Sequence, residues 1–105
     1  MSYMAEKFNV ARTCLMLPHE KGEAYSIMAA FHECSLGLME YKGASLGGDD
    51  SSDLDKLVSF MNTDGVEDDP IKGKWLLKAE RFSLEERREI SRIVDALAYA
   101  FSREG

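Results

Sequence analysis

The residues best suited to chemistry are His32, Glu33 and Cys34, which place an imidazole, a carboxylate and a thiol side by side in the sequence. Such groups bind zinc, and a cysteine beside a histidine base is a common catalytic nucleophile. The surrounding apolar pattern is helical, however, and residues one or two positions apart on a helix point in different directions. The three side chains therefore do not converge on one ion, and His32 does not reach the thiol of Cys34. We predict no metal site, no cofactor and no catalytic residues, and hence a protein that is not an enzyme.

Acidic residues dominate the middle of the chain, where only Lys56 opposes them: Asp49, Asp50, Asp53, Asp55, Asp64, Glu67, Asp68 and Asp69. A calcium-binding loop needs a glycine at its sixth position and a glutamate at its twelfth. Counting from Asp49 or from Asp64 meets neither requirement. From Ile71 onward basic residues predominate, so the two parts of the chain differ in charge. This asymmetry favours either the steering of a charged partner or a solvated acidic segment near helix N-termini.

Two further patterns bear on phosphate and nucleic-acid binding. The sequence GASLGG at 43–48 lacks the glycine and lysine spacing of a phosphate-binding loop. The arginines near position 90 suit a helix that reads DNA, but three glutamates on the same predicted helix repel phosphates: Arg87, Arg88 and Arg92 against Glu85, Glu86 and Glu89. We therefore predict no nucleic-acid binding.

The elements that position these residues are helices, because apolar residues recur at spacings of three and four. The segments with this pattern are 3–17, 20–42, 54–61, 70–82 and 84–101. They predict an all-α fold, a small helical bundle of four to five helices that forms a single domain over residues 1–105. In the final segment we expect the apolar residues to face inward: Leu84, Ile90, Ile93, Val94, Leu97 and Phe101.

Residues that start and stop helices mark the boundaries. Pro18 ends the first helix, and the glycine-rich stretch 43–52 is a loop that closes on an N-cap serine or aspartate. Pro70 suits the first turn of the fourth helix. Ser83 and Glu86 form the S-x-x-E capping box of the last helix. Gly37 either weakens the second helix or permits a close helix crossing.

Composition bounds the class of protein. Of the 105 residues, 45% are hydrophobic and the formal net charge is −6, which excludes a disordered tail and a collagen-like chain. Cys14 and Cys34 lie within apolar helical patterns, so we expect reduced, buried thiols. The sequence contains no targeting segment and no apolar run long enough to span a membrane, and we expect a cytoplasmic protein.

The first two predicted helices carry apolar residues over more than one face, which is more than a surface helix normally shows. A homodimer would cover the excess, and the alternative is that one helix is wrapped by its neighbours. Six methionines fit either core packing or an adaptable recognition surface.

These features lead to the hypothesis of an acidic helical regulator that binds and sequesters or inhibits a protein partner, such as a transcription factor or an enzyme. The partner is expected to be basic, because acidic residues at the rim would accelerate the encounter. The predicted anchors are apolar residues of the first two helices: Phe8, Leu15, Met28, Phe31, Met39 and Tyr41. The alternative is a small enzyme or ligand-binding protein with an apolar cavity between helices, where Tyr25, His32 or Glu33 would supply the polar groups.

Overall fold

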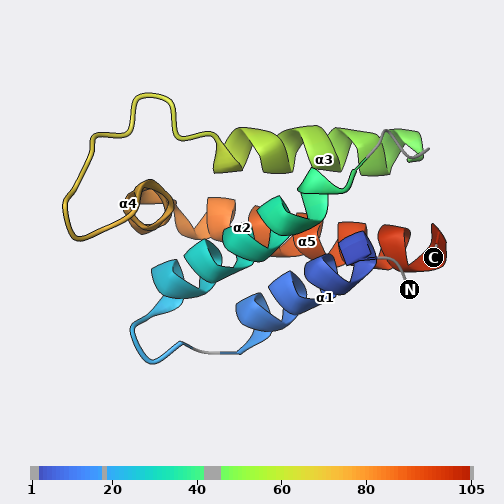
Figure 1. The fold of residues 1–105 in the computed structure, drawn as a ribbon, viewed down its shortest axis with the longest axis horizontal. Coiled ribbons are helices and arrows are strands. Elements are labelled where there is room, and N and C mark those ends of the chain that lie inside the picture. The colour runs from blue at the N-terminus through green and yellow to red at the C-terminus, as the bar shows by residue number, and fades with distance from the viewer. Residues whose placement is uncertain (1–2, 18, 42–45, 105) are drawn as a thin grey trace.

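The computed structural model describes residues 3–17, 19–41 and 46–104, and these residues contain five helices and no strand. The helices are α1 (Tyr3–Met16), α2 (Glu23–Met39), α3 (Gly48–Met61), α4 (Lys74–Arg81) and α5 (Leu84–Glu104). The all-α fold predicted from the sequence is therefore confirmed. Helix α5 is the longest and packs against α1 and α3, while α2 packs against α1 and α4 (Figure 1).

The chain forms a compact globule by itself. Its radius of gyration is 13.3 Å, close to the ~13 Å expected for this length. Its accessible surface of 6333 Å² is near the ~5,900 Å² that size scaling gives for a monomeric protein of this mass. A single copy of the chain does not test the predicted homodimer, which stays a prediction.

The core lies where α1, α2 and α5 meet. Phe8 of α1 packs edge-on against Phe101 of α5, with ring centroids 4.9 Å apart. Farther along α1, Arg12 pairs with Asp95, which lies earlier in α5 than Phe101, so the two helices are antiparallel. The inward residues predicted for α5 are buried, with the exception of Leu84. Leu84 is exposed because it is the first residue of α5, and the helix reaches the core only farther along, at Ile90.

Gly37 permits the close crossing of α1 and α2. A Cβ atom at this position would lie 3.2 Å from the Cβ of Lys7 and 3.3 Å from the ring of Phe8. Both distances are tighter than ordinary contacts between carbon atoms. Of the two interpretations drawn from the sequence, the structure therefore supports the helix crossing.

The connection between α4 and α5 follows the predicted capping box. The backbone N–H of Glu86 donates to the Ser83 hydroxyl at 3.1 Å, and the backbone N–H of Ser83 donates to the Glu86 carboxylate at 2.9 Å. On the other side of α4, the indole N–H of Trp75 donates to the carbonyl of Met61 at 2.9 Å. This bond ties α4 to the end of α3.

Three predicted boundaries were wrong. Helix α2 runs over Glu23–Met39 and is shorter than the predicted 20–42. Helix α3 begins at Gly48, inside the predicted loop, and no side chain caps it, because its N-cap residue is Gly47. Pro70 does not open α4, which begins four residues later at Lys74. A proline fixes its own φ angle but does not require the following residues to be helical.

Candidate interaction cleft

The six predicted anchors do not form one surface. Phe8 and Phe31 are fully buried in the core, so neither is available to a partner in this conformation. Tyr41 is half-buried and its ring lies 6.3 Å from that of Phe101. Met39, at the end of α2, has 80% of its surface exposed.

The other two anchors line separate hollows. Met28 lies with Met61 and Trp75 in a shallow, mostly apolar hollow at the start of α4. Leu15 lies in a deeper cleft between the end of α1 and α5, which is the candidate functional site. Partner binding by the six residues stays a prediction. Because they lie in different regions of the molecule, they would not contact one partner as a single surface.

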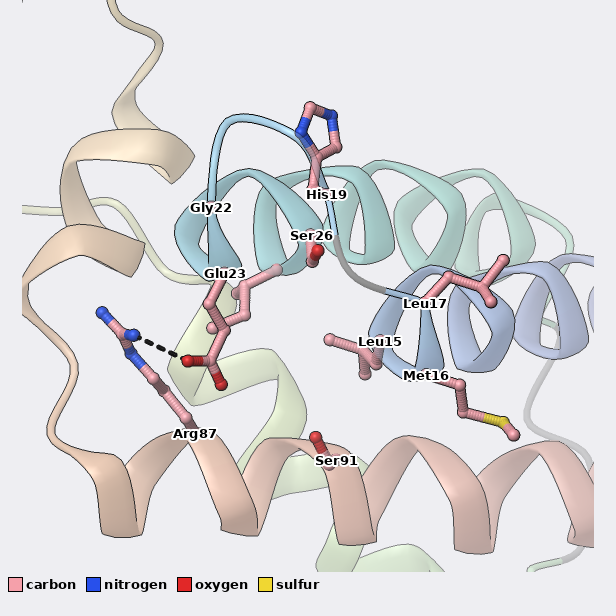
Figure 2. A pocket seen from close by; sticks show the side chains of 10 residues that line it. Leu15, Met16, Leu17, His19, Gly22, Glu23, Ser26, Arg87 and Ser91 are labelled. Carbon is pink, nitrogen blue, oxygen red and sulfur yellow. Dashed lines mark hydrogen bonds and ion pairs between the residues drawn. The ribbon is translucent and has the colours of Figure 1, made fainter.

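The cleft has a volume of about 410 Å³ and is open on one side. Its lining comes from the end of α1, the connecting loop, the first turns of α2, and α5: Leu15, Met16, Leu17, His19, Gly22, Glu23, Ser26, Ile27, Arg87 and Ser91. Figure 2 shows Glu23 facing Arg87 at one end and Met16 above α5 at the other. Cavities of this size accommodate a small ligand or a few side chains of a partner.

Hydrogen bonds shape the loop that forms the upper wall. The backbone N–H of Lys21 donates to Nδ1 of His19 at 3.0 Å, and the N–H of Gly22 donates to the His19 carbonyl at 3.0 Å. Gly22 has a φ of +107°, which side-chain-bearing residues rarely adopt. The imidazole also stacks on Tyr25, with ring centroids 5.3 Å apart. The chain therefore reverses tightly between α1 and α2, leaving the end of α1 free on one side.

The apolar wall of the cleft is unusually exposed. Met16 and Leu17 are consecutive, and 67% and 62% of their surfaces are accessible. Single exposed apolar residues are ordinary, but contiguous ones beside a concave surface are typical of binding sites. Ile27 and Ser26 form the buried floor.

Arg87 provides the positive charge of the cleft. Its Nη1 donates to Oε2 of Glu23 at 3.0 Å, and its Nη2 makes a long 3.4 Å bond to the carbonyl of Ala79. Its Nε is buried and has no hydrogen-bond partner within the described structure. A guanidinium has five N–H donors, so Arg87 has capacity for a further acceptor.

The cleft continues as a groove along the seam of α1 and α5. The next section is lined by Arg12, Leu15, Met16, Ser91, Arg92 and Asp95, and shares three of these residues with the cleft. An ion pair between Arg12 and Asp95 then crosses the groove. Beyond it the groove extends toward Tyr99, which is also exposed. The shared lining makes the cleft one end of a longer surface.

Half of the eight acidic residues in the middle of the chain pair with the basic part of the chain. Asp53 is buried and accepts two hydrogen bonds from Arg92, at 2.8 and 3.2 Å. Three further carboxylates of this segment form ion pairs, Asp50–Arg103, Glu67–Arg81 and Asp68–Lys74. Lys56, the one basic residue of the segment, pairs with Glu89. The charge asymmetry of the sequence thus becomes complementarity within one molecule. In the described residues no ion pair is found for Asp49, Asp55, Asp64 or Asp69, although Asp69 accepts hydrogen bonds from two backbone N–H groups.

The pKa directions follow from these contacts. The Arg92 guanidinium holds the pKa of Glu89 below its usual range through a hydrogen bond. Backbone N–H groups of Lys72 and Ile71 lower the pKa of Asp69 in the same way. Both contacts therefore stabilise the charged form of the carboxylate.

The cysteines are poor nucleophiles. Burial, together with the smaller effects of the nearby Cys14 and Glu33, raises the pKa of Cys34 to about 12. Burial and Glu33 also raise the pKa of Cys14, which is half-buried rather than buried as expected. A thiolate is the reactive form of cysteine, so both residues stay protonated and unreactive at neutral pH. In the part of the chain that is described, no group of three histidine, cysteine or acidic residues is arranged to hold a metal ion.

The polar residues proposed for a ligand cavity lie elsewhere. Glu33 pairs with Lys7 at 3.4 Å on the crossing of α1 and α2, and His32 is exposed. Neither they nor Tyr25 are among the cleft residues.

Arg87 was not predicted as a site residue, because it was grouped with Arg88 and Arg92 as one basic face. The sequence did contain a signal for the apolar wall of the cleft. Leu15, Met16 and Leu17 are three consecutive apolar residues, and a helix cannot turn all three toward one core.

Comparisons with protein-family models, curated proteins and solved structures find no match to this chain. None of the described helices combines the length and apolar character that crossing a membrane would require.

Proposed function

We propose that this protein is a non-enzymatic regulator that binds a partner protein through the cleft at the end of α1. The observation that carries the proposal is the pair Met16 and Leu17, which expose most of their surface at the rim of a 410 Å³ cleft. Methionine side chains adapt to the shape of a partner, which suits a recognition surface. Binding there would sequester or inhibit the partner.

The geometry favours this cleft over the acidic segment as the binding surface. Carboxylates that already pair with arginine or lysine gain less from a basic partner than free ones do. A basic partner stays a prediction for Asp49, Asp55 and Asp64, whose carboxylates have no ion pair in the described structure. A cytoplasmic location would suit the two unpaired thiols.

The test is photo-crosslinking in cells of the native host. A photoreactive amino acid replaces Met16 in one variant and Val58 in another, because both side chains are exposed but Val58 lies on α3, away from the cleft. We expect one discrete adduct from position 16 and none from position 58. Equal adducts at both positions, or none at either, would refute the proposal.

The second candidate function is the binding of a small ligand, which the volume of the cleft also allows. The polar groups would then be Ser26, Arg87 and Ser91 rather than those predicted from the sequence. A thermal-shift screen of metabolites separates the two functions, because a ligand at 100-fold its Kd adds ~2.7 kcal/mol of stability.

A further inference from the structure

We infer that the groove between α1 and α5 binds a helix of the partner through an uncharged face, with one large apolar side chain beside Met16 and a second beside Tyr99, two helical turns away. This inference rests on the proposed function and names the chemistry of the partner. It extends the binding surface from the cleft to Tyr99, which the proposed function does not use.

The groove is one continuous surface from the cleft to Tyr99. The cleft shares three lining residues with the middle section of the groove. The middle section in turn shares Arg12 and Asp95 with the section that Tyr99 lines. The walls are the antiparallel helices α1 and α5 (Figure 1). A segment of a partner can therefore lie along the whole seam.

The charged groups of the groove are already paired within the protein. Each arginine and each carboxylate among the described lining residues has a partner of opposite sign. The pairs are Arg87–Glu23, Arg12–Asp95, Arg92 with Asp53 and Glu89, and, next to the groove, Arg103–Asp50. A charged side chain of an occupant would either stay unpaired or take one member of a pair and leave the other unpaired. Both outcomes cost free energy once the contact excludes water, so the lining favours an uncharged occupant.

Exposed apolar side chains lie on both sides of the central pair of Arg12 and Asp95. Met16 is exposed at the cleft, one turn along α1 from Arg12. Tyr99 is one turn along α5 from Asp95, and 66% of its surface is exposed although Arg103 lies over its ring. An occupant that covers both ends removes apolar surface from water at two places, and such buried apolar anchors supply most of the affinity of protein interfaces.

The distance between the two ends matches two turns of a helix. Met16 lies above α5 next to Ser91 (Figure 2). Tyr99 is eight residues beyond Ser91 on α5, or ~12 Å at ~1.5 Å per residue. Two side chains seven residues apart on a partner helix share one face and are ~10.5 Å apart. The residues between them on that face would lie over the pair of Arg12 and Asp95, where an uncharged side chain fits best.

A helix suits this groove better than an extended segment does. The backbone N–H and C=O groups of α1 and α5 are bonded within their own helices along the groove, so they offer no partners to a second backbone. An extended segment buried between the two helices would leave its own N–H and C=O groups unpaired, which costs free energy. A helix pairs these groups internally.

The test begins with a displayed library of alanine-rich helical peptides, randomised along one face over three turns and selected on the immobilised full chain. We expect selected peptides to carry Leu, Met or Phe at two positions seven residues apart, with uncharged residues between them on the same face. Selection of Asp, Glu, Lys or Arg at those intermediate positions would overturn the inference.

Charge variants of one selected peptide test the inference without altering the protein. The residue between the two apolar anchors is replaced by Glu in one variant and by Lys in another, and affinity is measured by fluorescence anisotropy. Each replacement should weaken binding about 10-fold, because neither charge finds a free partner in the groove. If either replacement strengthens binding, the groove recognises charge and the inference is wrong.

Variants of the protein locate the bound peptide. Met16→Asp and Tyr99→Asp should each weaken binding at least about 10-fold, because each places a charge at one apolar end. Met16→Leu and Tyr99→Phe keep these side chains apolar and should bind like the wild type, which guards against misfolding as an explanation. Val58→Asp on α3 is the matched control and should leave the affinity unchanged. Equal affinities for the three Asp variants would overturn the inference.

The dependence on Tyr99 distinguishes this inference from the proposed function. Peptides that depend on Met16 but not on Tyr99 would overturn the inference and leave the cleft as the binding site of a partner or a small ligand. If no selected peptide depends on Met16, the inference is overturned, and the crosslinking at position 16 decides the proposed function separately.

Discussion

The pair Asp53–Arg92 offers the sharpest test of how the two oppositely charged parts of the chain are joined. Asp53 lies on α3 and its side chain is 9% exposed, while Arg92 on α5 is 50% exposed. Arg92 donates two hydrogen bonds to this carboxylate and further ones to Glu89. Removing Arg92 would leave a buried carboxylate with neither of these bonds.

The expected cost can be worked out from these exposures. Removing one partner of a fully buried ion pair costs ~3–5 kcal/mol. Water can reach the vacated site because Arg92 is half-exposed, so we expect Arg92→Met to lower the free energy of unfolding by about 2 kcal/mol. Asp53→Asn leaves Arg92 with Glu89 and solvent, and should cost about 1 kcal/mol.

The assay is a double-mutant cycle measured by urea unfolding. Because Asp53→Asn removes the charge that Arg92→Met would leave unpaired, the double variant should lose less stability than the sum of the two single variants. We expect a coupling energy of about 1–2 kcal/mol, within the range for contacting residues. Lys74 and Asp68, which are 3.4 Å apart, more exposed and not bonded to Asp53 or Arg92, provide the control pair and should couple by less than about 0.5 kcal/mol.

A coupling energy for Asp53 and Arg92 as small as that of the control pair would refute this reasoning. The acidic segment would then be held to α5 only loosely, and its carboxylates would be as available to a basic partner as the sequence suggested.

Three further predictions concern packing, capping and the thiols. Gly37→Val should destabilise the protein by about 1–3 kcal/mol in urea unfolding, because its side chain would overlap the ring of Phe8; unchanged stability would mean that α1 can move away. Ser83→Ala should cost about 1 kcal/mol and Ser83→Asp much less, and equal losses would argue against the capping box. Cys34 has a raised pKa of about 12, so folding favours its protonated form and this contribution to stability is lost as pH rises from 9 toward 12. The stability of the wild type should therefore fall faster over that interval than that of Cys34→Val, and parallel curves would contradict the assigned pKa.

The sequence was sufficient to predict what depends on local physics. Helical periodicity gave the all-α class, and the capping box of Ser83 and Glu86 has the predicted pair of hydrogen bonds. Both features involve residues within a few positions of one another. Whether Gly37 weakens α2 or permits a close helix crossing was left open, because the answer depends on which helix packs against it. Only the three-dimensional structure supplies that information.

The predictions that failed depend on long-range contacts. Phe8 and Phe31 lie on apolar faces, and the periodicity of one helix does not reveal whether such a face meets the core or a partner. The first turn of α3 was assigned to a loop because glycine and aspartate favour loops in isolation. In the structure this turn is held in place by Leu54 and Leu57, which are buried farther along the same helix.

Charge is where local reasoning and the fold diverge most. A run of acidic residues in a sequence suggests an acidic surface, but Asp53 and its neighbours lie opposite arginines and lysines that follow them by up to about fifty positions. Pairing within the molecule leaves less free charge than composition suggests. Conversely, Arg87 comes from a helix with many glutamates, yet it faces a cleft where its only carboxylate partner in the described structure is Glu23. The charge of a stretch of sequence therefore does not predict the charge of the surface it forms, because partners supplied by other helices decide which charged groups stay unpaired.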